Sequence, residues 1–182
     1  MGKVILVTGG SRSGKSTYAE KYFQKKDDIL YIATSIITDE EMRQRVQRHK
    51  DTRNKKWKTY EGYKDLHLPV NEFQGSGVLL DCITIMITNL LFEENRDFEN
   101  FKSEDMEEIK RISEREIEKL VNSVREKNID LVMVTNEVGY GLVPDYKLGR
   151  IYRDLAGFVN QYTATLCDEV YLVACGLPLK LK

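Results

Sequence analysis

Five short apolar runs recur along the chain, and each is bounded by glycine or polar residues. They cover residues 3–8, 29–34, 77–81, 130–135 and 169–174. A run that is apolar at consecutive positions is typical of a strand buried on both faces, as in a parallel sheet. A turn at 176–178 follows the last run, and we expect residues 179–182 to add a short edge strand.

Amphipathic segments between these runs predict helices. We expect helices over residues 15–24, 38–50, 82–92 and 146–167, together with a long surface helix that ends near Lys127. Thr38, with Glu41 three residues later, forms a capping-box signature for the second of these. Strands and helices that alternate in this way predict a single α/β domain across residues 1–182, with right-handed crossovers.

Composition narrows the class of protein. The chain has 182 residues, 41% hydrophobic and 31% charged, and a net charge of −1. This charge argues against a nucleic-acid binder, which usually carries a strong basic excess. We expect no membrane span, because the apolar stretches fall short of the ~20 residues that one requires. The three cysteines lie in apolar runs without a CxxC pair, so we expect reduced core residues of a cytoplasmic protein: Cys82, Cys167 and Cys175.

The turn after the first run matches a phosphate-binding motif at every position. The pattern G-x-x-x-x-G-K-S/T is met by Gly9, Gly10, Ser11, Arg12, Ser13, Gly14, Lys15 and Ser16. Its glycines let backbone N–H groups point at an anion, and the following helix adds about half a positive charge. We expect Lys15 to contact the β- and γ-phosphates and the Ser16 hydroxyl to bind Mg²⁺. The motif predicts nucleotide binding and a P-loop NTPase fold of the RecA-like type.

Carboxylates at strand ends supply a second part of the predicted site. Asp81 ends an apolar run and is the natural partner of the Mg²⁺ ion, although an Asp there can instead cap the helix that begins at Cys82. Glu137 follows the run at 130–135 and is the competing carboxylate. Ligands of open parallel sheets gather at the carboxyl ends of the strands. We therefore expect these residues to face the nucleotide: Thr34, Ser35, Asp81, Asn136 and Glu137.

Small P-loop proteins divide into switch GTPases, motor ATPases and metabolite kinases. A switch GTPase reads its base through N/T-K-x-D after a late strand, where this chain has residues 135–138, Thr-Asn-Glu-Val. A RecA-type motor is normally larger and more basic, so a small-molecule kinase remains. A generic kinase does not explain segment 43–58, which has eight Lys or Arg against one acid. That segment is either a solvated helix face or a phosphate-handling surface.

Further motifs follow one another along nearly the whole chain. They are Tyr31–Ser35, Arg45–Lys50, Val78–Thr84, Thr88–Phe92, Thr135–Pro144, Tyr152–Gly157 and Val159–Gln161. Together with the glycine loop, they resemble the bifunctional adenosylcobinamide kinase/adenosylcobinamide-phosphate guanylyltransferase family of cobalamin biosynthesis. Two departures are visible. Ser11 stands where the family often has Ala, and Arg48 stands where a His often precedes the reactive one, which leaves His49 as the only candidate on its helix.

The resemblance implies a two-step enzyme. In the first step, GTP or ATP phosphorylates the aminopropanol hydroxyl of adenosylcobinamide, with Mg²⁺ bound to the nucleotide. In the second, GTP transfers GMP to His49 with loss of pyrophosphate, and the GMP passes to the cobinamide phosphate to give adenosylcobinamide-GDP. The resemblance also implies His49 and Lys15 as catalytic residues, and a homotrimer.

The residues around His49 agree with that role. A neutral imidazole is a competent nucleophile near neutral pH and divides one displacement into two. Neighbouring cations would stabilise negative charge on the transferred group and on pyrophosphate: Lys50, Arg53, Lys55 and Lys56. A lone histidine in a charged helix can also be a solvated surface residue. The other histidine, His67, has no predicted role.

Other site residues are implied by the resemblance alone. Family positions that contact the guanine nucleotide match Thr34, Ser35, Ile36, Lys50, Asp51, Thr52, Arg53 and Glu61. Glu61 is expected to accept hydrogen bonds from the guanine N1–H and exocyclic amine. Arg153 and Asp154 have a functional or a structural role, the latter as an ion pair. Two other functions stay open: a monofunctional kinase for another metabolite, and a nucleotide-dependent switch or binding module.

Overall fold

In the part of the chain that the structure describes, the five apolar runs form neighbouring strands in the middle of one seven-stranded sheet. The structure is a computed structural model, and it describes residues 2–36, 40, 47, 53–94 and 96–182. In chain order the elements are β1 (Val4–Thr8), α1 (Lys15–Tyr22), β2 (Ile29–Ala33), β3 (Lys58–Glu61), α3 (His67–Glu72), β4 (Gly77–Asp81), α4 (Ile83–Phe92), α5 (Ser103–Lys127), β5 (Asp130–Val134), α6 (Lys147–Leu166), β6 (Glu169–Ala174) and β7 (Leu177–Lys180).

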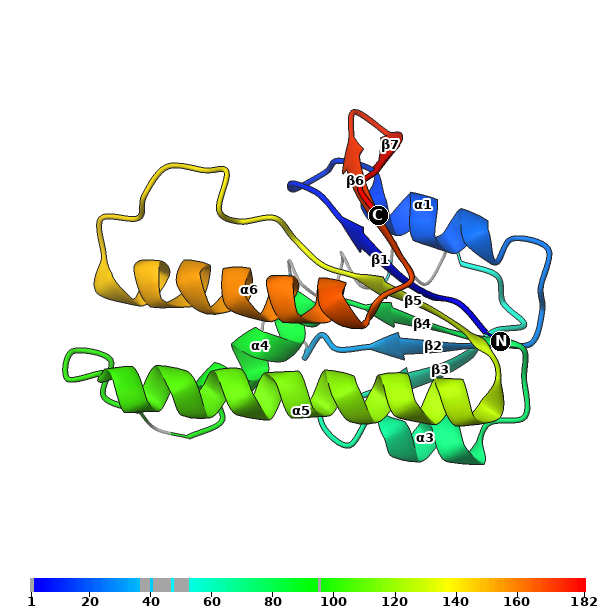
Figure 1. Ribbon diagram of the computed structural model, residues 1–182, viewed down its shortest axis with the longest axis horizontal. Coiled ribbons are helices and arrows are strands. Elements are labelled where there is room, and N and C mark those ends of the chain that lie inside the picture. Colours follow the sequence, from blue (N-terminus) through cyan, green and yellow to red (C-terminus); the bar gives the residue numbers. More distant parts are fainter. Residues whose placement is uncertain (1, 37–39, 41–46, 48–52, 95) are drawn as a thin grey trace.

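The sheet is parallel except at one edge. Its strand order is β3-β2-β4-β5-β1-β6-β7, and among the described residues only the β6–β7 pair is antiparallel (Figure 1). The register aligns one row of residues across five strands: Glu61, Ala33, Asp81, Val134 and Val7. The loops that follow these strands therefore leave the sheet side by side, at its carboxyl edge.

Side chains of the central strands alternate between two apolar cores. In β1, Val4 and Leu6 belong to the core formed with α3, α4, α5 and α6, whereas Ile5 and Val7 belong to the core formed with α1. Figure 1 shows α1 on one side of the sheet and α5 with α6 on the other. The central strands are buried on both faces, which confirms the predicted α/β class with a mostly parallel sheet flanked by helices.

Helix α5 has the amphipathic pattern expected of a long surface helix. Its buried apolar positions recur at helical spacing: Ile109, Ile117, Leu120, Val121 and Val124. The Asp105 carboxylate accepts a hydrogen bond from the Lys102 N–H at 2.8 Å in the first turn, and the helix ends at Asn128, which has a left-handed φ of 56°. None of the helices in the described part of the chain has both the length and the apolar character of a membrane-crossing segment.

The structure differs from the sequence prediction mainly at the edges of the sheet. The mostly exposed strand β3 and the six-residue helix α3 are not predicted. Strand β7 begins at Leu177, two residues before the predicted strand. The helix predicted at 38–50 lies outside the described residues apart from Glu40 and Gln47, and so do its capping-box residues Thr38 and Glu41. Helices α1, α4 and α6 agree with prediction to within two residues at their ends.

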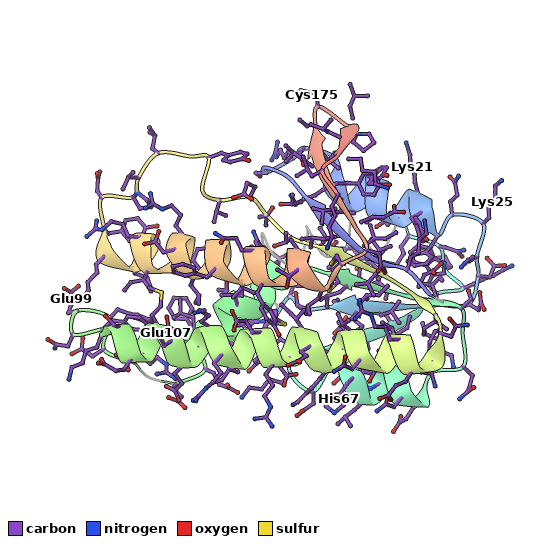
Figure 2. All side chains as sticks on the ribbon, in the orientation of Figure 1. Lys21, Lys25, His67, Glu99, Glu107 and Cys175 are labelled. Carbon is purple, nitrogen blue, oxygen red and sulfur yellow. The ribbon has the colours of Figure 1, made fainter. Side chains whose placement is uncertain are left out.

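The cysteine prediction is wrong at one position. Cys82 and Cys167 are buried, but Cys175 is exposed. Cys175 and Gly176 form the two-residue turn between β6 and β7, with φ values of 53° and 79°. Positive φ at both positions is typical of a type I′ hairpin turn. The thiol is exposed because it lies at the hairpin tip, as Figure 2 shows.

Candidate active site

The loop after β1 has the curled form that its glycines predict. Gly9 has no room for a side chain, because a Cβ there would overlap the carbonyl oxygen of Val173. Gly14 is the N-cap of α1 and has a φ of 96°, a left-handed value that favours glycine. The buried Lys15 ammonium donates a hydrogen bond to the Gly10 carbonyl oxygen at 3.0 Å. A lysine and the N-terminus of α1 thus meet at one tight turn, an arrangement that suits a phosphate group.

The β6–β7 turn supports this loop from the other end of the chain. The Gly176 N–H donates a hydrogen bond to the Ser13 carbonyl oxygen at 2.8 Å, and a Cβ on Gly14 would lie 3.0 Å from the Gly176 Cα. The hydroxyls of Ser13 and Thr8 are buried and have no hydrogen-bond partner among the described residues. Buried polar groups normally have a partner, so two unpartnered hydroxyls set this loop and the end of β1 apart. The exposed tip of the loop consists of Gly10, Ser11 and Arg12.

Asp81 lies on the face of the sheet that α1 covers. Leu79, two residues earlier in β4, packs in the core on that face. The Asp81 Oδ2 atom accepts a hydrogen bond from the Tyr31 hydroxyl at 2.9 Å. The N-cap of α4 is Cys82, without a side-chain cap, so Asp81 is not the helix cap that the sequence left open. Two strand spacings separate β4 from β1, which puts Asp81 about 10 Å from the end of β1.

A cation and a second carboxylate lie near Asp81. The Arg53 guanidinium stacks 3.1 Å from the centroid of the Tyr31 ring and donates to Thr59 Oγ1 at 3.2 Å. Burial and the Asp81 charge raise the pKa of Tyr31 well above its ordinary value, so the phenol stays a hydrogen-bond donor. Burial also raises the pKa of Glu20 on α1; the Arg53 charge opposes this rise, and the Asp81 charge adds to it. The surroundings of Asp81 therefore combine both signs of charge.

The start of α1 and the end of β4 carry oxygen atoms of the kind that bind magnesium. Ser16 lies in the first turn of α1 and Asp81 ends β4, and hydroxyl and carboxylate oxygens are donors that Mg²⁺ prefers. Within the described chain, Asp81 accepts its hydrogen bond through Oδ2 only, which leaves Oδ1 for a ligand. Glu20 follows Ser16 by one helical turn and lies on the same side of α1. Glu20 is not among the site residues predicted from the sequence, although its i, i+4 spacing from Ser16 was an available signal.

Hydrogen bonds join the loops at the carboxyl edge. The Thr34 hydroxyl donates to the Cys82 carbonyl oxygen at 2.8 Å and accepts from the Cys82 N–H at 2.9 Å. The Asn89 amide donates to the Thr34 carbonyl oxygen at 2.7 Å, and the Asn136 amide donates to the Thr84 hydroxyl at 2.9 Å. The loops after β2, β4 and β5 are held together in this way. Thr84 and Asn89 lie in two of the sequence motifs, but neither has a predicted role.

The remaining predicted residues are spread along this edge. Ser35 and Ile36 follow β2, and Ile36 is exposed. Glu61 ends β3 in the aligned row, but four strand spacings, about 19 Å, separate β3 from β1. Arg153 and Asp154, for which the sequence allowed a functional role or a structural ion pair, form an ion pair with an N–O distance of 3.2 Å. Four predicted site residues lie outside the described residues: His49, Lys50, Asp51 and Thr52.

Comparison with known proteins decides the family. A family model described as cobinamide kinase / cobinamide phosphate guanyltransferase matches residues 5–181. The chain belongs to this family. It is 45% identical over 184 residues to the "Bifunctional adenosylcobalamin biosynthesis protein CobU" of Salmonella typhimurium, which covers 98% of this chain and 99% of that protein. It is 41% identical over 183 residues to the protein of the same name from Escherichia coli, again at 98% and 99%. The "Bifunctional adenosylcobalamin biosynthesis protein CobP" of Pseudomonas aeruginosa is 33% identical over 180 residues, which cover 97% of this chain and 96% of that protein.

Membership of the cobinamide kinase/guanyltransferase family confirms the resemblance carried by the motifs. It also confirms the predicted enzyme class, a kinase and nucleotidyltransferase of cobalamin biosynthesis, and the P-loop NTPase-like fold. Both transfers of the family take a group from a nucleoside triphosphate. The curled loop after β1 is the part of this structure that suits a triphosphate.

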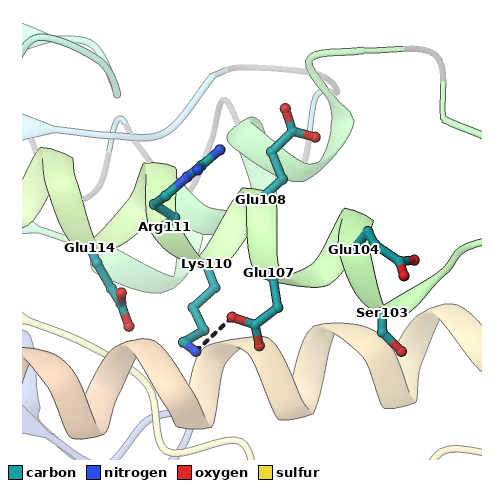
Figure 3. A pocket seen from close by; sticks show the side chains of 7 residues that line it. All are labelled: Ser103, Glu104, Glu107, Glu108, Lys110, Arg111 and Glu114. Atoms are coloured by element: carbon teal, nitrogen blue, oxygen red, sulfur yellow. Dashed lines mark hydrogen bonds and ion pairs between the residues drawn. The ribbon is translucent and has the colours of Figure 1, made fainter.

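Two cavities of this cobinamide kinase/guanyltransferase lie outside the site. One of about 610 Å³ lies along α5 and is lined by Ser103, Glu104, Glu107, Glu108, Lys110, Arg111 and Glu114 (Figure 3). Its glutamates disfavour a phosphate-bearing ligand, and its Lys110 already pairs with Glu107 at 3.0 Å. The other, of about 460 Å³, includes Asp28, Ser76 and Ile129, which precede β2, β4 and β5. It therefore lies at the amino edge of the sheet, opposite the loop after β1.

A group of possible metal ligands joins α5 to the start of α3. Ligand atoms of Asp65, His67 and Glu116 lie within 4.8 Å of one another. The Lys119 ammonium is 2.8 Å from Glu116 and 3.4 Å from Asp65, so a cation already balances both carboxylates. The group also lies away from the β6–β7 turn that supports the loop after β1, since His67 and Cys175 are on opposite sides of the molecule in Figure 2. We therefore interpret this group as a salt-bridge network.

Proposed function

We propose that residues 1–182 form one catalytic domain that carries out both transfers of the family on adenosylcobinamide. GTP or ATP phosphorylates the aminopropanol hydroxyl, and GTP then supplies GMP to give adenosylcobinamide-GDP and pyrophosphate. The observation that carries the proposal is the loop after β1, where Lys15 and the N-terminus of α1 meet at a turn built on Gly9 and Gly14. Relatives named for adenosylcobalamin biosynthesis support the choice of substrate.

In the kinase step, the acceptor hydroxyl oxygen bonds to the γ-phosphorus as the bond to the β–γ bridging oxygen breaks, and the hydroxyl proton passes to water. Lys15 exchanges its hydrogen bond to the Gly10 carbonyl for one to a phosphate oxygen. Ser16 and Asp81 would hold Mg²⁺, which neutralises charge on the phosphate oxygens when it is bound. Tyr31 keeps the Asp81 carboxylate in place through its hydroxyl.

In the guanylyl step, a ring nitrogen of His49 bonds to the α-phosphorus of GTP and pyrophosphate leaves. A phosphate oxygen of adenosylcobinamide phosphate then attacks the same phosphorus, and the bond to His49 breaks. The position of Arg53 supports a role for this part of the chain at the nucleotide site. Its guanidinium stacks on the Tyr31 ring, and the Tyr31 hydroxyl contacts Asp81. Three residues separate Arg53 from His49 in the sequence, so the chain between them can span at most about 14 Å. The proposed nucleotide contacts in this joining segment are Lys50, Asp51 and Thr52.

The proposed covalent intermediate has a direct test. Incubation with GTP labelled on its α-phosphate should leave an acid-labile, base-stable label on the chain. His49→Ala should lose the label and keep kinase activity, since the loop after β1 does not need the imidazole. His67→Ala is the matched control, because the chain has two histidines, and it should be labelled like the wild type.

Each other result of the labelling experiment has a defined meaning. Equal labelling of His49→Ala contradicts the nucleophile. A wild-type chain that phosphorylates the corrinoid but takes no label is a monofunctional kinase. A chain that binds nucleotide and turns over no corrinoid is a switch or binding module. Lys15→Ala should lose the kinase step, because the loop then lacks the cation that faces the phosphates.

The proposed guanine contact is Glu61. A carboxylate can accept from the guanine N1–H and exocyclic amine together, and adenine offers no such pair of donors. Glu61→Gln should lower the preference for GTP over ATP in the guanylyl step roughly tenfold, as expected when one charge-assisted hydrogen bond is removed. Glu126→Gln, at an exposed position of α5, is the control. Unchanged discrimination between the nucleotides in Glu61→Gln would contradict the contact.

A homotrimer and a cytoplasmic location follow from the family resemblance. The exposed Leu177 and Leu179 of β7, with Leu181 just after the strand, support self-association, because apolar edge strands are usually covered. Sedimentation at several protein concentrations measures the assembly. A chain that stays monomeric at all of them contradicts the trimer.

A further inference from the structure

The loop between β5 and α6 exposes several large apolar side chains. Tyr140 is 82% exposed, Leu142 96%, Val143 62% and Tyr146 67%. We call residues 138–146 the apolar loop; it is the yellow segment that arches away from the helices in Figure 1. Large apolar side chains gathered on one exposed segment usually mark a surface that binds another molecule.

The chain just before the apolar loop is attached to the loop after β1. We call that loop, residues 9–16, the phosphate loop. The Glu137 N–H donates a hydrogen bond to the Gly9 carbonyl oxygen at 3.1 Å, and the Thr135 N–H donates to the Val7 carbonyl oxygen at 3.0 Å. The chain thus leaves the sheet directly beside the turn that suits a triphosphate. A molecule that lies against the start of the apolar loop is therefore close to the phosphate that the kinase step would transfer.

The far end of the apolar loop is fixed to α6. The Arg150 guanidinium donates to the carbonyl oxygens of Pro144 at 2.9 Å and Asp145 at 2.7 Å. Gly149 gives the loop room on the helix, because a Cβ there would lie 2.7 Å from the Pro144 Cβ and 2.8 Å from the Tyr146 Cε2. A glycine inside a helix is unfavourable by itself. The helix therefore accommodates the loop, whose apolar residues project between two fixed ends.

The acceptor of the proposed kinase step has a size and chemistry that match this surface. A corrin ring is a broad macrocycle with apolar faces and an amide-bearing rim, and the aminopropanol arm extends from that rim. When the hydroxyl of this arm meets the γ-phosphate, the ring must lie outside the sheet, beside the phosphate loop. The cavity on α5 is lined by charged groups, and the second cavity lies at the opposite edge of the sheet.

We propose that the apolar loop is the docking surface for the corrin ring of adenosylcobinamide. Leu142 and Val143 pack against a face of the ring, and Tyr140 and Tyr146 add aromatic contact and hydroxyls that reach the amides of the rim. This inference rests on the proposed kinase step. A second copy of the chain is the competing occupant, but the exposed leucines of β7 offer it a separate apolar surface.

Leu142→Ser is the informative variant, because a residue that is 96% exposed can change without disturbing the core. The KM for adenosylcobinamide in the kinase reaction should rise about tenfold, the effect of removing one large apolar side chain from a binding surface. The nucleotide KM and the kcat should stay within about twofold, because the phosphate loop is unchanged. Leu68→Ser, at a half-exposed leucine of α3, is the matched control and should leave every constant unchanged.

A fragment of the acceptor separates docking from chemistry. With 1-amino-2-propanol, which lacks the ring, Leu142→Ser and the wild type should phosphorylate at equal rates. Unequal rates would overturn the docking role, and so would an unchanged corrinoid KM in Leu142→Ser. Leu142→Ser could instead lower the oligomeric mass in sedimentation, with the corrinoid KM changing only as far as the mass changes. That result would assign the loop to a second copy of the chain and overturn the proposal.

Direct binding distinguishes failure of this inference from failure of the proposed function. Equilibrium dialysis with cobinamide, read by its visible absorption, should give a Kd about tenfold weaker for Leu142→Ser than for the wild type. A wild type that binds cobinamide through the loop without phosphorylating it contradicts the kinase step and leaves the docking surface standing. A wild type that phosphorylates cobinamide, with a Kd that Leu142→Ser does not change, contradicts the docking surface alone.

Discussion

Replacing Tyr31 with Phe removes one hydroxyl from the site and little else. The hydroxyl donates to Asp81 at 2.9 Å, and Tyr31 is 3% exposed, so water cannot easily replace it. The Phe ring would keep its place under the Arg53 guanidinium. A hydrogen bond to a charged acceptor contributes about 1.5–3 kcal/mol, and we expect Tyr31→Phe to destabilise the fold by that amount. With a urea m-value of about 2 kcal/mol/M, the unfolding midpoint should fall by about 1 M.

A matched phenol tests whether the Asp81 charge sets this magnitude. The Tyr152 hydroxyl donates to the neutral carbonyl of Thr84 at 3.0 Å, so Tyr152→Phe should cost only about 1 kcal/mol. A double-mutant cycle of Tyr31→Phe with Asp81→Ala should give a coupling energy of at least about 1 kcal/mol. Additive single variants, or equal losses in Tyr31→Phe and Tyr152→Phe, would refute this reasoning.

The same variant tests whether Tyr31 positions Asp81 for a metal ion. A carboxylate without its hydrogen bond can rotate away, so Tyr31→Phe should need severalfold more Mg²⁺ for half-maximal kinase activity. At saturating Mg²⁺ the kcat should recover, because the groups that contact the triphosphate are unchanged. Titration of Mg²⁺ at fixed nucleotide measures both quantities. A lower kcat with an unchanged Mg²⁺ requirement would show that Tyr31 does not act through the metal site.

Three further outcomes concern single groups. Gly9→Ala should cost about 1–3 kcal/mol of unfolding free energy and weaken nucleotide binding in a titration, because its Cβ would overlap the Val173 carbonyl. A thiol reagent should modify the exposed Cys175 rapidly in the native protein. Cys82 and Cys167 should react only after unfolding, because burial hides both thiols and raises the pKa of Cys82 to about 11 and that of Cys167 to about 12. Urea unfolding at several pH values should show the free energy of unfolding falling above pH 10. The pKa of Tyr31 is raised in the folded state, so this residue stabilises the fold only while its phenol stays protonated. In Tyr31→Phe the free energy of unfolding should fall less over the same pH range.

The central strands were predictable because both of their faces are buried. Residues 4–8 and 77–81 read as continuous apolar runs for that reason. The edge strand β3 has the sequence Lys-Thr-Tyr-Glu, and β7 is exposed along its whole length. An edge strand is held by hydrogen bonds to one neighbour, which leave no apolar pattern in the sequence. The six-residue helix α3 is too short to show a helical period.

The site divides in the same way between local and distant contacts. The glycine loop is contiguous in sequence, so its motif predicted its position between β1 and α1. Asp81 was predictable because it ends an apolar run. Tyr31 was placed in a motif without a role, and Arg53 was expected to contact the nucleotide. The stacking of Arg53 on Tyr31 and the hydrogen bond from Tyr31 to Asp81 depend on the fold and leave no pattern in the sequence. Glu20 joins this group only because α1 lies over β4.

The last strand pair shows how far the phosphate loop depends on distant chain. The Val173 carbonyl excludes any side chain at Gly9, and the Gly176 N–H is the donor to the Ser13 carbonyl. Gly176 itself has a φ of 79°, a value that other residues adopt only with strain. The motif explains which residues the loop contains, whereas the C-terminal hairpin fixes the shape in which they meet a triphosphate. A substitution at Gly176 should therefore resemble a change in the loop, although Gly176 lies outside the motif.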